Sequence, residues 1–417
     1  MIDTSGVRWD ALAIKAEDGG LGFAAVFKDN CIYLWSWKQS DGGRSANGTT
    51  RAGGGGRWAC FHIDHMTPLP ALMVEVIEEI LFRLPPEEPA YLVRAALVCK
   101  AWRGVLTDSG FLRRYREFHR TPPLLGYLHD SYTAPRFVPT STAASPFSKL
   151  GASWPRVLDC RHGRVLIDLA YHPVSKFTVW DPITGDRKNF VVPTDTYLSH
   201  YNAAVLCAMD AGCDHLNCHS GPFRVVLVEK QMLDGEGIAQ ASVYSSAADA
   251  WNTASASIVF RYSIESRPGL LIGDALYFPL YYGVGILKYD LSNHGLSTIE
   301  TPGVPSGAIA IKAEDGGLGF VAMSRNKTNC IYLMSRQAGG GWVRHKAIEL
   351  ETLLPISPVP SYWPNVVGYV EGTDTIFISI DDVGVFTLEL KSRQTKKVGE
   401  SSNYNYIVPY TSFYTPR

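Results

Sequence analysis

LPALMVEVIEEILFRLPPEEPAYLVRAALVCKAWR, residues 69–103, is the first strongly helical stretch of the chain. Apolar residues recur at spacings of three and four along residues 72–84, and glutamates occupy the opposite face, which predicts an amphipathic helix. Pro85 and Pro86 end this helix, because proline cannot continue it. The apolar positions are Leu72, Val76, Ile77, Ile80, Leu81 and Leu84, and the acidic ones are Glu75, Glu78 and Glu79.

Two further helical patterns follow. One runs over residues 90–106, and the next begins after Asp108 or Ser109, either of which can cap it. Their apolar positions are Leu92, Ala96, Leu97, Val98, Trp102, Phe111, Leu112 and Tyr115. We therefore predict three short helices, a cluster too small to be very stable without a partner.

From residue 124 onward the chain consists of short β-type runs separated by turn signals. These runs are rich in β-branched and aromatic residues. They are VLIDL (165–169), FTVW (177–180), FRVVLV (223–228), ALYFPLYY (275–282), CIYLM (330–334), TIFISI (375–380) and GVFTLEL (384–390).

A similar strand end recurs along this region. Its central residue, aromatic or apolar, precedes Asp, Ser or Glu at Trp180, Tyr244, Tyr289, Met334 and Leu388. A four-stranded propeller blade takes roughly 40–50 residues, so these spacings favour a β-propeller of about six blades with loop insertions. A pair of β-sandwiches is the alternative fold. The fold class is thus a small all-α module followed by an all-β propeller-like domain.

The N-terminal segment duplicates part of the later sequence. Residues 11–23 and 308–320 are identical at 12 of 13 positions, and NCIYL recurs at 30–34 and 329–333. A single repeat cannot bury both faces of its strands without neighbours. We expect residues 1–62, with a Gly-rich linker at 39–57, to be a duplicated propeller fragment that is poorly ordered or loosely docked, or else pairs at a sheet edge.

The helical stretch resembles the F-box family. It has the Leu69-Pro70 opening, the EVIEEILFRLP segment at 75–85 and the LVCKAWR segment at 97–103, in that order. Residues 86–97 and 111–128 resemble a group of grass F-box proteins, and DCRHGRVLID (159–168) and VWDPITGDRKNFVVP (179–193) resemble the propeller-like domain that follows the F-box in them. The domains expected are 1–62, an F-box at 66–118 and a target-binding propeller at 124–417.

The resemblance implies a function in protein degradation. F-boxes dock onto a Skp-type adaptor, which links a substrate receptor to a cullin–RING ubiquitin ligase of the SCF type. The chain would then be non-catalytic, with the F-box on the adaptor and the propeller on a target protein that the sequence does not identify. The residues implied to form or support the adaptor-facing surface are Leu69, Pro70, Ile80, Leu81, Leu84, Pro85, Val98, Cys99 and Trp102. A propeller lectin or enzyme with a non-functional helical segment is the alternative.

The amino-acid composition restricts the classes of partner that the chain is expected to bind. A net charge of −1 lacks the positive field of a nucleic-acid-binding protein, and no stretch has the ~18 apolar residues of a membrane helix. Eight scattered cysteines do not resemble a disulfide framework, which favours the cytoplasm or nucleus. We expect no nucleic-acid partner, no membrane and no cofactor.

One polar loop carries possible metal ligands. CAMDAGCDHLNCHSG (207–221) contains Cys207, Cys213, His215, Cys218 and His219, but their spacing matches no standard Cys/His pair pattern. We expect an ordinary insertion loop, with a zinc site or a local disulfide as alternatives. The glycines of 17–23 and 314–320 lack the strand–loop–helix setting of a phosphate site, and no Gly-x-Ser-x-Gly elbow occurs. No catalytic residues are predicted.

Overall fold

The computed structural model describes residues 74–129, 136–140, 156–169, 175–193, 200–209, 213–216, 218, 220–324, 329–337, 339–355, 364–400 and 404–414, together with the backbone of four strands before residue 62. It divides into two compact units. One comprises Met1–Pro85 and Ala90–Tyr115 with the last three residues, and the other comprises Pro86–Pro89 and Arg116–Tyr414. Among the described helices, none has the length and apolar character needed to cross a membrane.

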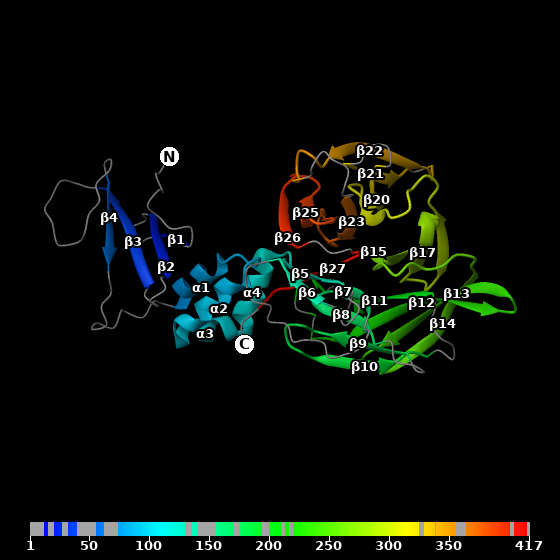
Figure 1. The fold of residues 1–417 in the computed structure, drawn as a ribbon. Helices are drawn as coiled ribbons and strands as arrows, with labels where there is room; N and C mark the ends of the chain where they lie inside the picture. Colours follow the sequence, from blue (N-terminus) through cyan, green and yellow to red (C-terminus); the bar gives the residue numbers. More distant parts are fainter. Residues whose placement is uncertain are drawn as a thin grey trace. The chain divides into compact units, whose positions relative to one another are not determined.

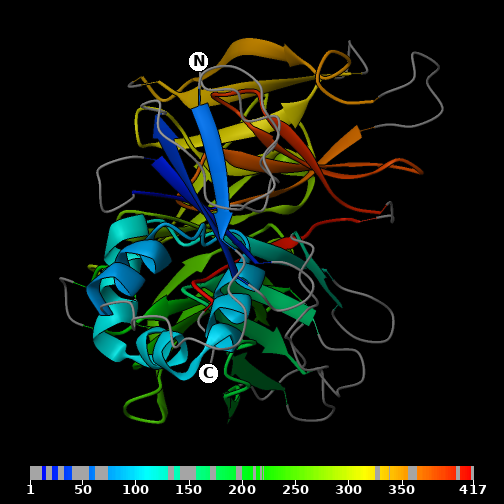
Figure 2. The ribbon, with the colours of Figure 1, turned by 90° about the vertical axis from the view of Figure 1, so that its left-hand side faces the viewer.

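Four helices form the module predicted from residues 69–103 (Figures 1 and 2). Their bounds are α1 Val74–Phe82, α2 Pro89–Val98, α3 Lys100–Thr107 and α4 Ser109–His119. Phe111 of α4 stacks on Phe82 of α1 with ring centroids 4.9 Å apart, and the Tyr115 hydroxyl donates a hydrogen bond to the Leu84 carbonyl at 2.7 Å. The carboxylate of Asp108 accepts the backbone N–H of Phe111 at 2.7 Å, which confirms Asp108 as the predicted cap.

The prediction of one helix over residues 90–106 is wrong. Cys99 has an extended backbone (φ −160°, ψ 171°) and separates α2 from α3, so the module has four helices and not three. Neither glycine nor proline stands at this position, so the sequence carries no local signal for the break. The change of direction lets two successive residues of α3, Val105 and Leu106, become buried.

The duplicated N-terminal segment contains a four-stranded antiparallel sheet whose described strands pair with one another in the order β1-β2-β3-β4. Their bounds are β1 Leu12–Lys15, β2 Leu21–Val26, β3 Ile32–Gln39 and β4 Gly56–Phe61. The register matches that of the internal copy: Leu12 pairs with Ala24 as Ile309 pairs with Val321, and Trp37 pairs with Trp58 as Arg336 pairs with Trp342. The segment therefore forms a blade-like sheet of its own.

Five four-stranded antiparallel sheets and one three-stranded sheet form a six-bladed propeller, which excludes the alternative of two sandwiches (Figure 1). Blade 1 is β7 Arg156–Arg161, β8 Arg164–Asp168, β9 Lys176–Trp180 and β10 Arg187–Val191; blade 2 is β11 Tyr201–Cys207, β12 Phe223–Leu233, β13 Glu236–Ser245 and β14 Ala250–Val259. Blade 3 is β15 Leu270–Ile272, β16 Ala275–Pro279, β17 Gly285–Asp290 and β18 Leu296–Glu300; blade 4 is β19 Ile309–Lys312, β20 Leu318–Met323, β21 Cys330–Arg336 and β22 Trp342–Glu349. Blade 5 is β23 Pro364–Tyr369, β24 Thr375–Ile380, β25 Gly384–Glu389 and β26 Thr395–Gly399; blade 6 is β27 Val408–Thr411, β5 Leu124–His129 and β6 Arg136–Pro139.

Blade 6 closes the ring with strands from both ends of the domain. Its innermost strand, β27, is the last of the chain and pairs with β5, the first strand after the helices, so that Val408 lies opposite Leu128. A buried apolar cluster lies between each pair of adjacent blades. The clusters on either side of blade 6 contain Ile407 and Tyr410, at 1% and 0% exposure. The ring is thus held together by apolar burial and not by covalent links in its described part.

The recurring strand end marks the third strand of a blade. Trp180, Tyr244, Tyr289, Met334 and Leu388 lie in β9, β13, β17, β21 and β25 and are all buried. An aspartate at the end of two of these strands begins the turn to the fourth strand. Asp181 accepts the backbone N–H of Ile183 at 2.8 Å, and Asp290 accepts that of Ser292 at 3.1 Å.

The seven predicted β-type runs all lie in propeller strands, with one correction. The run at 275–282 ends as a strand at Pro279, and residues Tyr281–Gly283 form a 3-10 turn in which Tyr282 has φ +64° and is 83% exposed. The long interval between Trp180 and Tyr244 includes residues 208–222, which connect β11 to β12 as the predicted insertion loop.

Deleting residues 1–62 is expected to leave adaptor binding and the melting temperature of the propeller unchanged and to improve solubility. The blade position that this segment duplicates is already filled by β19–β22, since β19 lies between β15 and β23. The internal copy is also joined to its neighbours by short loops, whereas the N-terminal copy would close a very long one. Differential scanning fluorimetry of the full and shortened chains measures this. A clear fall in the propeller's melting temperature would show that the segment supplies strands to the ring.

Candidate functional site: the helical surface and the propeller channel

The helical module exposes apolar side chains that its own packing does not cover. Leu97 of α2 is 80% exposed, and Val74 and Val76 of α1 are 54% and 39% exposed. The buried residues of α2 are Leu92 and Ala95, three positions apart on one face. Leu97 falls about 140° round the helix from Leu92 and therefore points away from that face. Exposed apolar residues of this kind are typical of a surface that binds a partner helix or groove.

Seven of the nine residues implied by the F-box resemblance are described, and they divide into two groups. Ile80, Pro85, Val98 and Trp102 are half-buried and Cys99 is exposed, so these five can contribute to a surface. Leu81 and Leu84 are buried, at 0% and 7% exposure, and can only support the surface from behind. Leu69 and Pro70 lie outside the described residues.

The sequence alone does not distinguish Leu97 as a surface residue, because it is one of the apolar positions of a pattern that predicts a continuous helix. The feature that could have identified Leu97 is its position on the helix, away from the face that carries Leu92 and Ala95. An ion pair also connects two of the helices on the solvent side: Arg114 of α4 lies 2.6 Å from Glu78 of α1. An exposed pair of this type adds less than about 1 kcal/mol, so apolar packing holds the module together.

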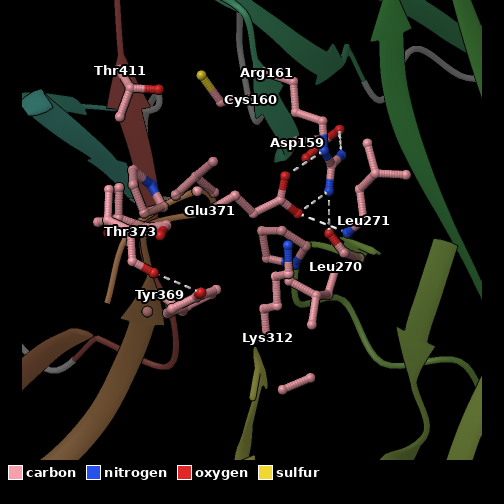
Figure 3. A pocket seen from close by; sticks show the side chains of 18 of the residues that line it. Asp159, Cys160, Arg161, Leu270, Leu271, Lys312, Tyr369, Glu371, Thr373 and Thr411 are labelled. Atoms are coloured by element: carbon pink, nitrogen blue, oxygen red, sulfur yellow. Dashed lines mark hydrogen bonds and ion pairs between the residues drawn. The ribbon is translucent and has the colours of Figure 1, made fainter. Parts of the chain in front are cut away.

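The second candidate site is a cavity of about 430 Å³ in the channel of the propeller. Five of the six innermost strands line it, namely β7, β15, β19, β23 and β27. Figure 3 shows polar side chains from several blades around the cavity, among them Lys312 of blade 4, Tyr369 of blade 5 and Thr411 of blade 6. The Tyr369 hydroxyl donates a hydrogen bond to the Thr373 carbonyl at 2.8 Å, which fixes the ring at one wall.

A buried guanidinium crosses this channel. Arg161 of β7 forms ion pairs with Asp159 on the same strand and with Glu371, which follows β23, and its Nε donates to Glu371 Oε2 at 2.8 Å (Figure 3). It also donates to the Gly269 carbonyl before β15. Figure 3 shows Arg161 lying between the two carboxylates. Both acids therefore have a cationic partner.

Backbone groups extend this network to further blades. Asp159 accepts the N–H of Val205 in β11 at 2.8 Å, and Glu371 accepts the N–H of Leu271 in β15 at 2.9 Å. Four of the six blades thus meet in one hydrogen-bonded cluster, which we call the channel network (Asp159, Arg161 and Glu371). Burial raises the pKa of Asp159 above its usual range, although the Arg161 guanidinium opposes the rise. Because its two carboxylates are engaged with Arg161, this cluster joins blades and does not present a free acid or base.

Four of the five predicted Cys/His donors come together in the structure. One sulfur or nitrogen atom from each of Cys207, Cys213, His215 and Cys218 lies within 4.8 Å of all the others. His219 lies outside the described residues. The His215 ring stacks on His162 of the β7–β8 turn with centroids 4.2 Å apart. Burial, with smaller contributions from His215, Arg161 and Arg164, lowers the pKa of His162 to about 3, so this ring is neutral near pH 7.

Comparisons with known proteins agree with this architecture. A family model described as F-box protein AT5G49610-like, beta-propeller, matches residues 156–417, more than half of the chain, and an F-box domain model matches residues 72–114. No curated protein is similar enough to count as a match.

Many solved structures are similar to this chain only distantly. A chain of a nidogen/laminin complex is 11% identical, with 69% of this chain and 98% of that chain covered and a TM-score of 0.42. A GH93 α-L-arabinofuranosidase of Fusarium graminearum bound to arabinobiose is 9% identical, with 69% and 88% covered and a TM-score of 0.39. A putative 6-phosphogluconolactonase from Bacteroides uniformis is 11% identical, with 68% and 99% covered and a TM-score of 0.36. Similarities this distant carry no argument about activity.

Proposed function

Because the chain belongs to the family of F-box proteins with an AT5G49610-like β-propeller, we propose that it is a substrate-recognition subunit of an SCF-type cullin–RING ubiquitin ligase. The helices bind a Skp-type adaptor, and the propeller binds the protein to be modified. The observation that carries this proposal is an F-box, matched at residues 72–114, directly followed by a propeller. The ubiquitin chemistry takes place elsewhere in the complex, so the chain is a receptor and not an enzyme.

The exposed apolar residues of the helices support this function. Each Leu, Ile or Val that moves from water into a partner's groove contributes about 1.5–3 kcal/mol, so Leu97 with its half-buried neighbour Val98 can supply much of an interface. The half-buried Trp102 adds an aromatic residue, the type that most often dominates binding energy. The proposal includes a plant, grass-type origin, supported by the resemblance of residues 86–97 and 111–128, and a location in the cytoplasm or nucleus.

The target is proposed to bind at loops around the channel. Propellers hold partners with the loops at one end of the ring, on a scaffold whose blades stay fixed. The exposed Tyr282 on the β16–β17 connection gives one end of the ring an apolar contact residue, and polar residues that line the cavity give the channel hydrogen-bonding groups. Capture of bound proteins after proteasome inhibition identifies the target.

Replacing Leu97 by aspartate is expected to weaken binding of a Skp-type adaptor by at least ~10-fold, because a charge at an apolar contact must lose its hydration. The melting temperature stays unchanged, since Leu97 makes little contact within its own module. Isothermal titration of the purified full chain with the adaptor measures the affinity. Met232→Asp is the matched control, because Met232 is 65% exposed on the propeller.

Failure of the unaltered chain to bind any Skp-type adaptor would remove the proposed function and leave a propeller lectin or enzyme as the alternative. Equal weakening by Leu97→Asp and Met232→Asp would show that binding does not use the α2 surface. Full affinity in the Leu97 variant would place the adaptor on another face of the helices.

A further inference from the structure

The connection between β11 and β12 carries a compact set of soft metal ligands. Cys207 ends β11, and Cys213, His215 and Cys218 follow within the next eleven residues. The sulfurs of Cys207 and Cys213 lie 3.8 Å apart, and Nδ1 of His215 lies 3.7 Å from the sulfur of Cys218. All four donor atoms lie within 4.8 Å of one another. The chain thus brings four donors that are spread along the loop close to one another.

The sulfur–sulfur distance of 3.8 Å and the nitrogen–sulfur distance of 3.7 Å fit a tetrahedral ion. With a zinc–sulfur bond of about 2.3 Å, two thiolates on one tetrahedron are about 3.8 Å apart, and a thiolate and an imidazole nitrogen are slightly closer. Three sulfurs and one imidazole form a Cys3His set, which is a structural zinc combination. We propose that Cys207, Cys213, His215 and Cys218 bind one structural zinc ion. This departs from the expectation, drawn from their irregular spacing, of an ordinary polar loop without a cofactor.

A disulfide accounts less well for the cluster. A disulfide bond requires its sulfurs to be about 2.05 Å apart, and it would leave a third cysteine and a histidine gathered at the same point without a role. None of the described cysteines is in a disulfide. A metal ion uses all four donors, whereas a disulfide between Cys207 and Cys213 uses two.

The surroundings also suit a metal with thiolate ligands. The backbone N–H of Met209 donates to the sulfur of Cys207 at 3.3 Å, a contact that orients a ligand sulfur. Zinc with three thiolates has a net negative charge, and the buried Arg164 supplies a positive charge beside it. Arg164 donates to the carbonyl oxygens of Cys218 and Gly221 and interacts electrostatically with Cys207 and Cys218.

The ion would fix one part of the channel rim. Asp214, His215 and Leu216 line the channel cavity, and the stacking of His215 on His162 joins this loop of blade 2 to a turn of blade 1. Zinc binding therefore sets the position of a loop at one end of the channel. The inference concerns only the propeller and stands whether or not the helices bind an adaptor.

Metal analysis of the full chain, purified without chelators, tests the site. About one zinc ion per chain is expected by inductively coupled plasma mass spectrometry. Cobalt added to the metal-free protein is expected to give the visible absorption of tetrahedral Co²⁺ and the near-ultraviolet bands of thiolate ligation. Removal of the metal is expected to speed hydrogen exchange within residues 208–222 and leave exchange in blades 4 and 5 unchanged.

Substitutions test which of these residues bind the metal. Loss of an outer partner alone lowers metal affinity by roughly 10- to 100-fold, so Cys213→Ser and His215→Ala should lower zinc affinity by at least ~10-fold. His215 is exposed, which makes its variant the one least able to disturb folding, and circular dichroism checks this. Cys330→Ser in blade 4 is the matched control and should keep its zinc.

Two results would overturn the proposal. One is a folded chain that stays metal-free after incubation with zinc under reducing conditions. The other is a chain that, isolated under reducing conditions, still has Cys207 and Cys213 joined as a disulfide by intact mass after alkylation. Retention of zinc by Cys213→Ser and His215→Ala, with the same cobalt spectrum as the unaltered chain, would equally exclude these ligands. None of these measurements involves adaptor binding.

Discussion

Replacing Arg161 by methionine is expected to lower the free energy of unfolding of the propeller by about 3–5 kcal/mol. The guanidinium is buried and is the cationic partner of both Asp159 and Glu371. Its removal leaves Asp159, at 2% exposure, as a buried carboxylate without its cation, and burial of an unpaired charge is among the largest single destabilising effects. Urea unfolding followed by tryptophan fluorescence measures the change.

Arg344→Met provides the matched control. Arg344 of blade 4 is exposed and lies 4.4 Å from the centroid of the Tyr332 ring, a contact that contributes only about 0.5–1 kcal/mol. The triple variant Asp159→Asn, Arg161→Met and Glu371→Gln should recover part of the loss, because it removes the three charges together while keeping acceptors for Val205 and Leu271. An Arg161 variant no less stable than the Arg344 variant would show that the channel network does not hold the blades together.

Replacing Leu81 by aspartate is expected to unfold the helical module while the propeller keeps its own melting transition. Leu81 is fully buried in α1, so the variant loses the packing of a large side chain and places a carboxylate among apolar neighbours, at a cost of ~4 kcal/mol or more. A module of four short helices has little stability to lose. Adaptor binding is expected to disappear together with the helical circular dichroism signal.

Comparison with Leu97→Asp distinguishes the two causes of lost binding. The Leu81 variant loses binding because the surface no longer forms, and the Leu97 variant loses it while the helices stay folded. Trp102→Ala, at a half-buried position, is expected to fall between them, with weaker binding and a modest loss of stability. If the Leu81 variant retained its helical signal and full affinity, α1 would not be part of the structure that binds the adaptor.

Structural elements could be predicted from the sequence where a residue pattern repeats within a short stretch of chain. The spacing of Ile77 and Leu81 predicted a buried face of α1, and the two prolines at 85 and 86 predicted its end. The strand ends at Trp180, Tyr244, Tyr289, Met334 and Leu388 predicted blades because the same strand has the same surroundings in each of them. Local periodicity carries this information, since neighbouring residues decide which face of an element is buried.

Contacts between distant positions could not be predicted in this way. Arg161 and Glu371 are 210 residues apart and meet only because the ring brings blades 1 and 5 to one channel. The gathering of Cys207, Cys213, His215 and Cys218 depends on the path of an irregular loop, and the spacing of its donors carries no fixed geometry. The break at Cys99 likewise depends on tertiary packing, which overrides helix propensity at that residue.

Because β27 closes the ring, the helices are synthesised completely before the propeller can be. The helices are complete once residue 119 has left the ribosome, whereas blade 6 lacks its innermost strand until Thr411 has been made. Domains fold from the N-terminus as they emerge. A chain whose translation stops early would thus contain the complete helices and a propeller that lacks the innermost strand of blade 6.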